Sequence, residues 1–177
     1  RQVISIGNRA VGKSCIIKRS CETRVVAQYL QTIGIDYGVT KVNLRERELK
    51  VNIFDMSGHE IFHEVRNEFY KDTQGVILVF DVTDKASFDS LDDWIGEMRR
   101  DLEANTGASL DNVVFVVCGN KIDKGKRVID EADAKMWAMM KGYQYFETSA
   151  SSGAGVAEMF EALLAEIVGV FENGGKA

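Results

Sequence analysis

The sequence predicts an α/β fold in which a six-stranded, mostly parallel sheet is covered by helices on both faces. Short apolar runs of strand length alternate with longer segments that place apolar residues at helical spacing along the 177 residues. Two of the runs are joined only by the charged turn at residues 45–48, and a connection that short requires an antiparallel hairpin. We therefore expect a parallel sheet with one antiparallel hairpin at its edge.

Six apolar segments are expected to form the strands. The runs at 76–80 and 113–117 read VILVF and VVFVV, and unbroken apolar runs are typical of central strands that are buried on both faces. In chain order, the expected strands cover residues 3–6, 39–44, 49–54, 75–81, 113–118 and 145–148.

Helical periodicity fills the gaps between these strands. The last such segment carries its apolar residues at the spacing of one helix face, namely Val156, Met159, Phe160, Leu163, Leu164 and Ile167. The expected helices cover residues 13–22, 62–69, 87–103, 130–141 and 156–171.

Length and composition restrict the class of protein. A chain that is 45% hydrophobic suits one domain, which we expect at residues 1–172, with a linker or tail starting at 173–177. The net charge of −5 argues against nucleic-acid partners and a polybasic membrane patch, since both need concentrated Lys and Arg. Cys15, Cys21 and Cys118 form no CxxC pair, which favours reduced thiols in a cytoplasmic protein. We expect a monomer, with no membrane anchor in this chain.

The strongest motif is GNRAVGKS at residues 7–14, which fits GxxxxGK[ST] between an expected strand and an expected helix. Its glycines let several backbone N–H groups turn toward a phosphate, and the helix N-terminus adds partial positive charge. Lys13 would reach the β- and γ-phosphates, and Ser14 would bind Mg2+. The alternative is a glycine-rich turn without nucleotide. The expected phosphate-binding residues are Gly7, Asn8, Arg9, Ala10, Val11, Gly12, Lys13, Ser14 and Cys15.

A second motif, DMSGHE, starts at Asp55, where the second hairpin strand ends. The Asp55 carboxylate can hold Mg2+ through water, and the Gly58 N–H can meet a γ-phosphate that only a triphosphate supplies. A DxxG tetrapeptide is usually only a turn. Combined with the loop some 45 residues upstream, it indicates a binding site for a nucleoside triphosphate.

A third motif, NKID, follows the buried strand at 113–118 and contains Asn120, Lys121 and Asp123. The Asp123 carboxylate can accept hydrogen bonds from the N1–H and the exocyclic amine of guanine, whereas adenine would leave it unpaired. Alone, NKxD could be an ordinary polar loop. The segment 149–151 after the last strand adds Ser149, Ala150 and Ser151, of which Ala150 could present its N–H to guanine O6.

These elements occur in the order and spacing of Ras-superfamily small GTPases, across essentially the whole chain. Four segments of the sequence resemble the Rab-like group that carries a C-terminal J domain, although no J domain is present in this sequence. They are CIIKR, IGIDYGVTKV, VNIFDMSGH and VRNEFYKDTQGVILVFDV. The resemblance implies a P-loop G-domain that uses GTP, GDP and Mg2+. It also implies that Thr32 binds Mg2+ and senses the γ-phosphate, with Ser14 and Asp55 completing the metal site.

The same resemblance places Tyr37, Phe54 and Phe69 where Rab proteins carry three aromatic residues that effectors contact. Ordinary hydrophobic packing is the alternative for these side chains. In intact members of this group, the J domain would recruit a chaperone. The resemblance also associates the protein with ciliated cells, in addition to the cytoplasm.

Two departures from the family pattern concern hydrolysis. His59 stands where most relatives have the glutamine that orients the attacking water, so we expect a slow reaction. Arg9 stands at a position that is often glycine and lies close to the γ-phosphate. It could block an activating protein's arginine finger, act as a finger itself, or point outward to solvent. Together with Lys13 and Gly58, these residues are the candidate catalytic set.

Three further departures concern nucleotide retention. Val25 replaces an aromatic residue that packs on the base, Ser151 replaces a lysine, and Gln31 replaces a common proline. We expect faster nucleotide exchange and a more mobile segment before Thr32. The leading hypothesis is a GTP-binding switch with slow hydrolysis. The alternatives are a constitutively GTP-loaded binding module and, disfavoured by Asp123, an ATP-dependent P-loop enzyme.

Overall fold

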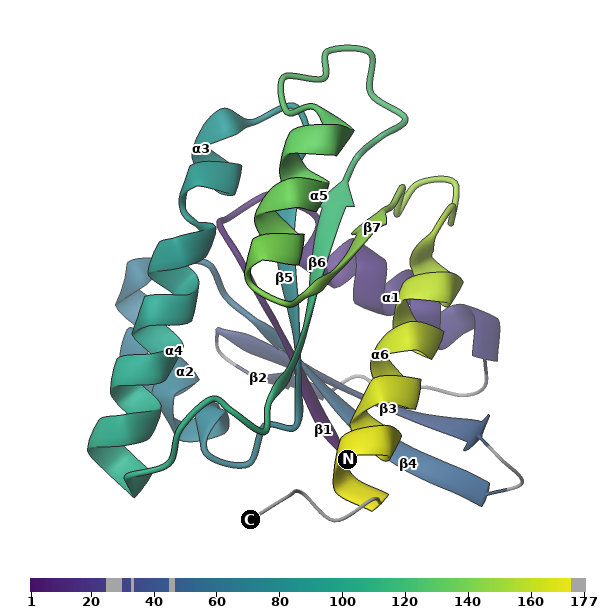
Figure 1. Cartoon of the computed structure of the whole chain (residues 1–177). Coiled ribbons are helices and arrows are strands. Elements are labelled where there is room, and N and C mark those ends of the chain that lie inside the picture. Colours follow the sequence, from purple (N-terminus) through teal and green to yellow (C-terminus); the bar gives the residue numbers. More distant parts are fainter. Residues whose placement is uncertain (25–29, 33, 45–46, 173–177) are drawn as a thin grey trace.

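The computed structural model describes residues 1–24, 30–32, 34–44 and 47–172. They form one seven-stranded sheet with the order β2-β3-β4-β1-β5-β6-β7 (Figure 1). The strands are β1 (Gln2–Ile6), β2 (Leu30–Thr32), β3 (Ile35–Leu44), β4 (Arg47–Met56), β5 (Gly75–Asp81), β6 (Val114–Asn120) and β7 (Gln144–Glu147). Neighbours from β4 across to β7 are parallel, whereas β2, β3 and β4 pair antiparallel.

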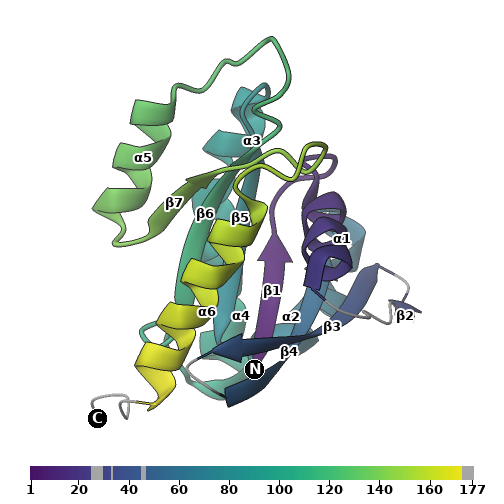
Figure 2. The ribbon, with the colours of Figure 1, turned by 90° about the vertical axis from the view of Figure 1, so that its right-hand side faces the viewer.

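Helices cover both faces of this sheet (Figure 2). They are α1 (Lys13–Arg24), α2 (His63–Tyr70), α3 (Lys85–Asp89), α4 (Leu91–Thr106), α5 (Glu131–Met140) and α6 (Val156–Glu172). Helices α1 and α6 pack on one face, where their apolar side chains join one core cluster. Helices α2, α4 and α5 pack on the other face and join a second cluster. All seven residues of β5 and of β6 are buried, as expected for central strands.

The fold class predicted from the sequence is confirmed, and all six expected strands are present. The structure adds β2, a three-residue strand that pairs with the start of β3, from Leu30 opposite Tyr37 to Thr32 opposite Ile35. Strand β3 also begins four residues earlier than expected, at residue 35 instead of 39. This region lacks a long apolar run. Its strand structure depends on hydrogen bonding to the neighbouring strands, which no local sequence pattern reveals.

The single helix expected at 87–103 is two helices. Ser90 separates α3 from α4, and its hydroxyl donates to the Ala86 carbonyl at 2.7 Å. A serine that bonds back to the preceding turn in this way competes with regular helix geometry. Beyond the break, α4 is a regular amphipathic helix that buries its apolar residues, which are Leu91, Trp94, Ile95, Met98 and Leu102.

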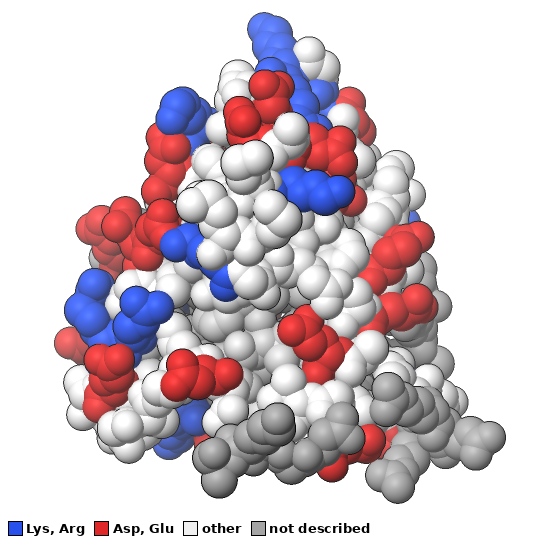
Figure 3. All heavy atoms as spheres, viewed as in Figure 1, with Lys and Arg blue, Asp and Glu red and all other residues white. Residues whose placement is uncertain are grey.

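Helix α6 confirms the expected apolar face, because all six residues named from its sequence are buried. No helix among the described residues is long and apolar enough to cross a membrane. On the face shown in Figure 3, acidic and basic side chains are intermixed around a largely uncharged centre. A domain boundary at residue 172 stays a prediction, because residues 173–177 lie outside the described part of the chain.

Candidate guanine-nucleotide site

The loop at residues 7–12 connects β1 to α1 at the carboxyl edge of the sheet, and both of its glycines are required by close contacts. Gly7 has φ of 149°, and a methyl group there would lie 2.2 Å from the Val79 carbonyl oxygen of β5. Gly12 has φ of 100°, and a methyl group there would lie 2.3 Å from Asn120 Nδ2. Any other residue at these positions would displace the loop from β5 and from Asn120 at the end of β6.

Lys13 begins α1 and points back into this loop. Its Nζ donates to the carbonyls of Gly7 at 2.9 Å and Asn8 at 2.7 Å. The side chain is buried, and this burial lowers the pKa of Lys13 to about 8. The ammonium therefore lies in the concave side of the loop, where the sequence motif places phosphate.

Ser14 and Asp55 meet beside Lys13. The Ser14 hydroxyl donates to Asp55 Oδ2, and Ser5 Oγ donates to Asp55 Oδ1 at 3.0 Å. Burial raises the pKa of the Asp55 carboxyl. The two side chains line a cavity of about 330 Å³ that also includes Arg9 and Gly58. A hydroxyl and a carboxylate oxygen facing one cavity are ligands that fit Mg2+.

Other expected residues around this cavity are only partly described. The Thr32 backbone lies in β2, but its side chain and that of Gln31 fall outside the described part of the structure, as does Val25 entirely. Asp36, at the start of β3, also lines the cavity, which sequence reasoning missed. Its only signal was its position four residues after Thr32.

Gly58 lies directly against the phosphate loop. A methyl group on it would be 2.5 Å from the Gly7 carbonyl oxygen and 2.6 Å from the Arg9 nitrogen. The segment after β4 therefore approaches the loop as closely as backbone atoms can, and only glycine fits at this contact.

The NKID and 149–151 segments form the other end of the site. Asn120 Nδ2 donates to the Val11 carbonyl at 2.9 Å, while Asn120 Oδ1 accepts from Thr148 Oγ1 at 3.0 Å and from the Ala150 N–H at 3.2 Å. One buried amide at the end of β6 thus joins the loops that follow β1 and β7. The Ala150 N–H, expected to face guanine, is engaged with Asn120 in this structure.

Lys121 and Asp123 complete this end. Lys121 has φ of 69°, and its Nζ bonds the Ala10 carbonyl at 2.6 Å and Asp81 Oδ2 at 2.6 Å. Asp123 Oδ1 accepts from Ser149 Oγ at 2.8 Å. A cavity of about 260 Å³ opens beside them, and its lining consists of Gly12, Cys15, Asn120, Lys121, Asp123, Lys124, Ala150 and Ser151. It shares no lining residue with the cavity of Ser14 and Asp55.

Two supporting residues at this end were not predicted. Arg19 on α1 donates from Nε to the Ala150 carbonyl at 3.1 Å and from Nη2 to the Ser151 carbonyl. Asp81, the last residue of β5, pairs with Lys121. Neither residue lies in a recognised motif, and only the three-dimensional arrangement reveals their roles.

Two of the residues that depart from the family pattern, His59 and Arg9, lie next to Gly58. His59 is half-buried, and its Nδ1 accepts from the Ile61 N–H at 3.2 Å. Arg9 is exposed and lines both the cavity of Ser14 and Asp55 and a larger one of about 550 Å³ next to His59 and Trp94.

The three aromatic residues expected at an effector surface form one row. The Tyr37 ring on β3 lies 4.9 Å from the Phe54 ring on β4, which lies 4.7 Å from the Phe69 ring on α2. All three are half-buried, so they combine packing with partial exposure. The structure brings them together, and both interpretations of them remain compatible with this contact.

The fold and the site together define a Ras-type G-domain. The chain belongs to the Ras family, whose model matches residues 2–169. As a member of this family of small GTPases, the chain binds guanine nucleotides.

Similar proteins include DnaJ homolog subfamily C member 27 from Mus musculus, Homo sapiens and Danio rerio, which are 62%, 61% and 60% identical over 176 residues. These matches cover 99% of this chain, which spans 64% of the length of those relatives. Their names agree with the J-domain group that the sequence resembles.

Cysteine reactivity tests whether the nucleotide occupies the cavity beside Asp123. Cys15 is exposed and lines that cavity, whereas Cys21 and Cys118 are buried and burial raises the pKa of Cys118 to about 12. We expect iodoacetamide to modify Cys15 first in the folded protein, and GDP to slow that modification several-fold by covering the cavity. Peptide mass spectrometry measures both effects. Equal labelling of Cys15 with and without GDP would contradict this placement of the nucleotide.

Proposed function

We propose that this chain is a guanine-nucleotide switch that binds GTP or GDP with Mg2+ and hydrolyses GTP slowly. One observation carries the proposal: Asn120 joins the loops of a phosphate end and a base end into a single site. Lys13, Ser14 and Asp55 supply the phosphate end, and Asp123 supplies the base end. Guanine is favoured over adenine because Asp123 needs two donors from the base.

The residues of the site have separate tasks in this proposal. The loop amides and Lys13 bind the phosphates, while Ser14, Asp55 and Thr32 would hold Mg2+, which would neutralise charge that develops on the phosphate oxygens. The Gly58 N–H donates to the γ-phosphate. Because GDP lacks that phosphate, the segments around Thr32 and Gly58 differ in their contacts with the two nucleotides, and this difference is what a switch requires.

The geometry of His59 supports a slow reaction. Its Nδ1 already accepts the Ile61 N–H, so in the neutral ring the proton lies on Nε2 and that nitrogen can only donate. A glutamine amide can accept from water and donate to the transition state at the same time. The imidazole cannot supply both functions to one attacking water.

The double variant His59→Gln with Arg9→Gly tests this account of the rate. We expect its single-turnover GTP hydrolysis to be at least several-fold faster than that of the original chain, because an amide regains the acceptor and the loop loses a bulky side chain. Quenched-flow measurement of phosphate release gives the rate. No acceleration would place the defect elsewhere in the site.

The second candidate is a binding module that stays loaded with GTP and relies on exchange, and His59 and Arg9 favour it. Denaturing the purified protein and identifying the released nucleotide by ion-pair chromatography distinguishes the two. Mostly GDP supports a slow GTPase cycle, whereas mostly GTP supports the loaded module.

The proposal extends to partners and location. We infer that effectors contact the row formed by Tyr37, Phe54 and Phe69. They would also contact the neighbouring segments around Thr32 and Gly58. A chaperone would be a partner only where a J domain follows this G-domain, as the names of the relatives suggest. A cytoplasmic location with a ciliary association remains part of the same proposal.

A further inference from the structure

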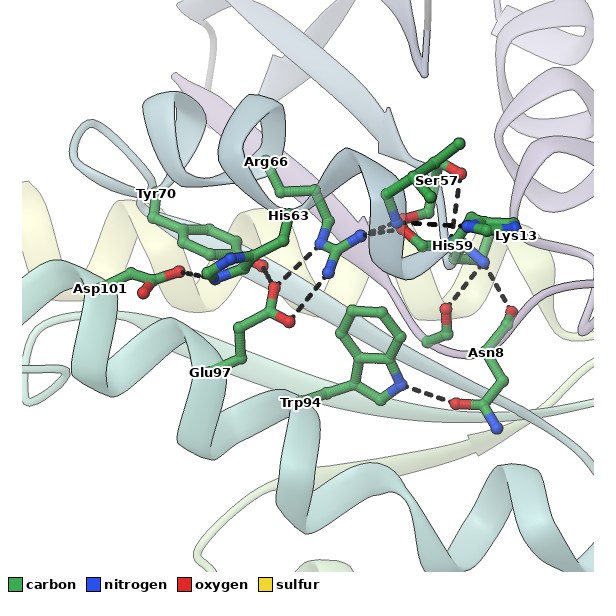
Figure 4. A network of polar contacts seen from close by, with 12 residues as sticks. Asn8, Lys13, Ser57, His59, His63, Arg66, Tyr70, Trp94, Glu97 and Asp101 are labelled. Carbon is green, nitrogen blue, oxygen red and sulfur yellow. Dashed lines mark hydrogen bonds and ion pairs between the residues drawn. The ribbon is translucent and has the colours of Figure 1, made fainter.

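A buried arginine connects the segment after β4 to helix α4 (Figure 4). Arg66 on α2 is only 2% exposed, and its guanidinium makes a two-pronged ion pair with Glu97 on α4. Nε lies 2.9 Å from Glu97 Oε1, and Nη2 lies 2.8 Å from Oε2. The Tyr70 hydroxyl donates to the same Oε1 at 2.6 Å. Burial acts to raise the pKa of Glu97, but these hydrogen bonds outweigh it and hold that pKa below its usual value.

The remaining nitrogen of this guanidinium is aimed at backbone. Arg66 Nη1 donates to the Ser57 carbonyl at 3.0 Å and to the His59 carbonyl at 2.7 Å. These two carbonyls belong to the residues on either side of Gly58. The Gly58 N–H belongs to the same peptide group as the Ser57 carbonyl, so fixing that carbonyl also fixes the direction of the N–H.

The phosphate loop is connected to the same part of α4. The Arg66 guanidinium lies over the Trp94 ring, 4.9 Å from its centre, and Trp94 Nε1 donates to Asn8 Oδ1 at 2.8 Å. The Asn8 carbonyl in turn accepts from Lys13 Nζ. Helix α4 therefore holds both sides of the expected γ-phosphate position, through Arg66 on one side and through Trp94 on the other.

We propose that Arg66 is a positioning residue for GTP, holding the Gly58 peptide in the orientation that contacts the γ-phosphate. This inference rests on the proposed function, since it assigns a cause to the GTP-specific contact of Gly58. The ion pair with Glu97 sets the guanidinium, and the two backbone donations transmit that position to Gly58. Arg66 itself touches no nucleotide.

Dissociation rates of GDP and of a non-hydrolysable GTP analogue test the proposal in the purified chain. Arg66→Lys keeps a positive charge near Glu97, but one ammonium cannot reach both the Glu97 carboxylate and the two carbonyls that Nη1 contacts. We expect it to speed release of the GTP analogue about tenfold, the equivalent of one lost hydrogen bond, with little change for GDP. A purely structural role would move both rates by the same factor, and that result would overturn the proposal.

Matched variants locate the cause. Glu97→Gln removes the ion pair that sets the guanidinium but keeps one side-chain oxygen that can accept from Arg66. We therefore expect the ratio of the two rates to shift in the same direction as for Arg66→Lys, by a smaller factor. An unchanged ratio would contradict the role of the ion pair in the proposal. Arg100→Lys changes an exposed arginine of the same helix and is expected to leave both rates unchanged.

A second variant covers the case in which Arg66→Lys does not fold. Arg66→Met combined with Glu97→Met removes both charges together, an exchange that buried ion pairs often tolerate. It also lacks the two donations, and we expect the same selective acceleration for the GTP analogue. If the original chain bound neither nucleotide, the proposed function itself would fail, which is a different result from equal acceleration of both.

Discussion

Asp123→Asn is expected to weaken guanine-nucleotide binding roughly 10²- to 10⁴-fold, since two hydrogen bonds from guanine are lost and each bond to a charged acceptor contributes about 1.5–3 kcal/mol. The orientation of the new amide follows from Ser149, whose Oγ accepts from the Ser152 N–H and therefore directs its own proton to residue 123. The amide oxygen would turn to Ser149, which leaves the NH₂ group facing the base. A donor would then oppose the donors of guanine.

Xanthine nucleotides provide the sharper measurement for this variant. Xanthine carries a carbonyl where guanine carries its exocyclic amine, so it offers an acceptor to the new NH₂ group. We expect Asp123→Asn to prefer xanthosine diphosphate over GDP in a calorimetric titration, the reverse of the original chain. Asp133→Asn, on the exposed surface of α5, is the control and should leave GDP binding unchanged. An unaltered preference would mean that Asp123 does not contact the base.

Lys13→Ala is the second change with a large expected effect. The ammonium would contact the β- and γ-phosphates of GTP but only the β-phosphate of GDP. Its loss should therefore weaken binding of GTP by roughly 10²- to 10⁴-fold and binding of GDP by roughly 10- to 10²-fold. The protein without nucleotide should change much less in stability, by about 1 kcal/mol. The carbonyls of Gly7 and Asn8 lose a donor, but a desolvated charge is also removed.

Calorimetry and thermal unfolding separate these two effects. Lys135→Ala, which removes an exposed lysine of α5, should alter neither quantity. If Lys13→Ala bound GDP as tightly as the original chain, the loop would not be the phosphate site. If it lost stability in proportion to affinity, the lysine would be mainly a structural residue.

Much of the fold could be predicted because its signals are local. The β5 and β6 runs are unbroken and apolar, and the prediction for β5 matches its observed bounds. Strand β2 could not be predicted, since three residues carry no periodicity and their pairing depends on β3. The break at Ser90 was missed for a similar reason, because the apolar pattern continues across it while a side chain bonds back to the turn.

The site divides in the same way. Motif residues such as Lys13, Asp55 and Asp123 could be named because their chemistry requires fixed spacing along the chain. The contacts of Arg66 could not, since its partners come from distant segments and nothing near it in sequence marks it as buried. Whether the motif residues perform their assigned tasks remains a prediction for the experiments above.

The buried amide of Asn120 has a consequence for nucleotide release. Because one side chain holds the Val11 carbonyl, the Thr148 hydroxyl and the Ala150 N–H, the loops cannot loosen independently. If a partner protein displaces the loop at one end of the nucleotide site, the hydrogen bonds of Asn120 transmit that displacement to the loop at the other end. We therefore expect the nucleotide to be released in one cooperative event, whichever of the two loops an exchange factor contacts.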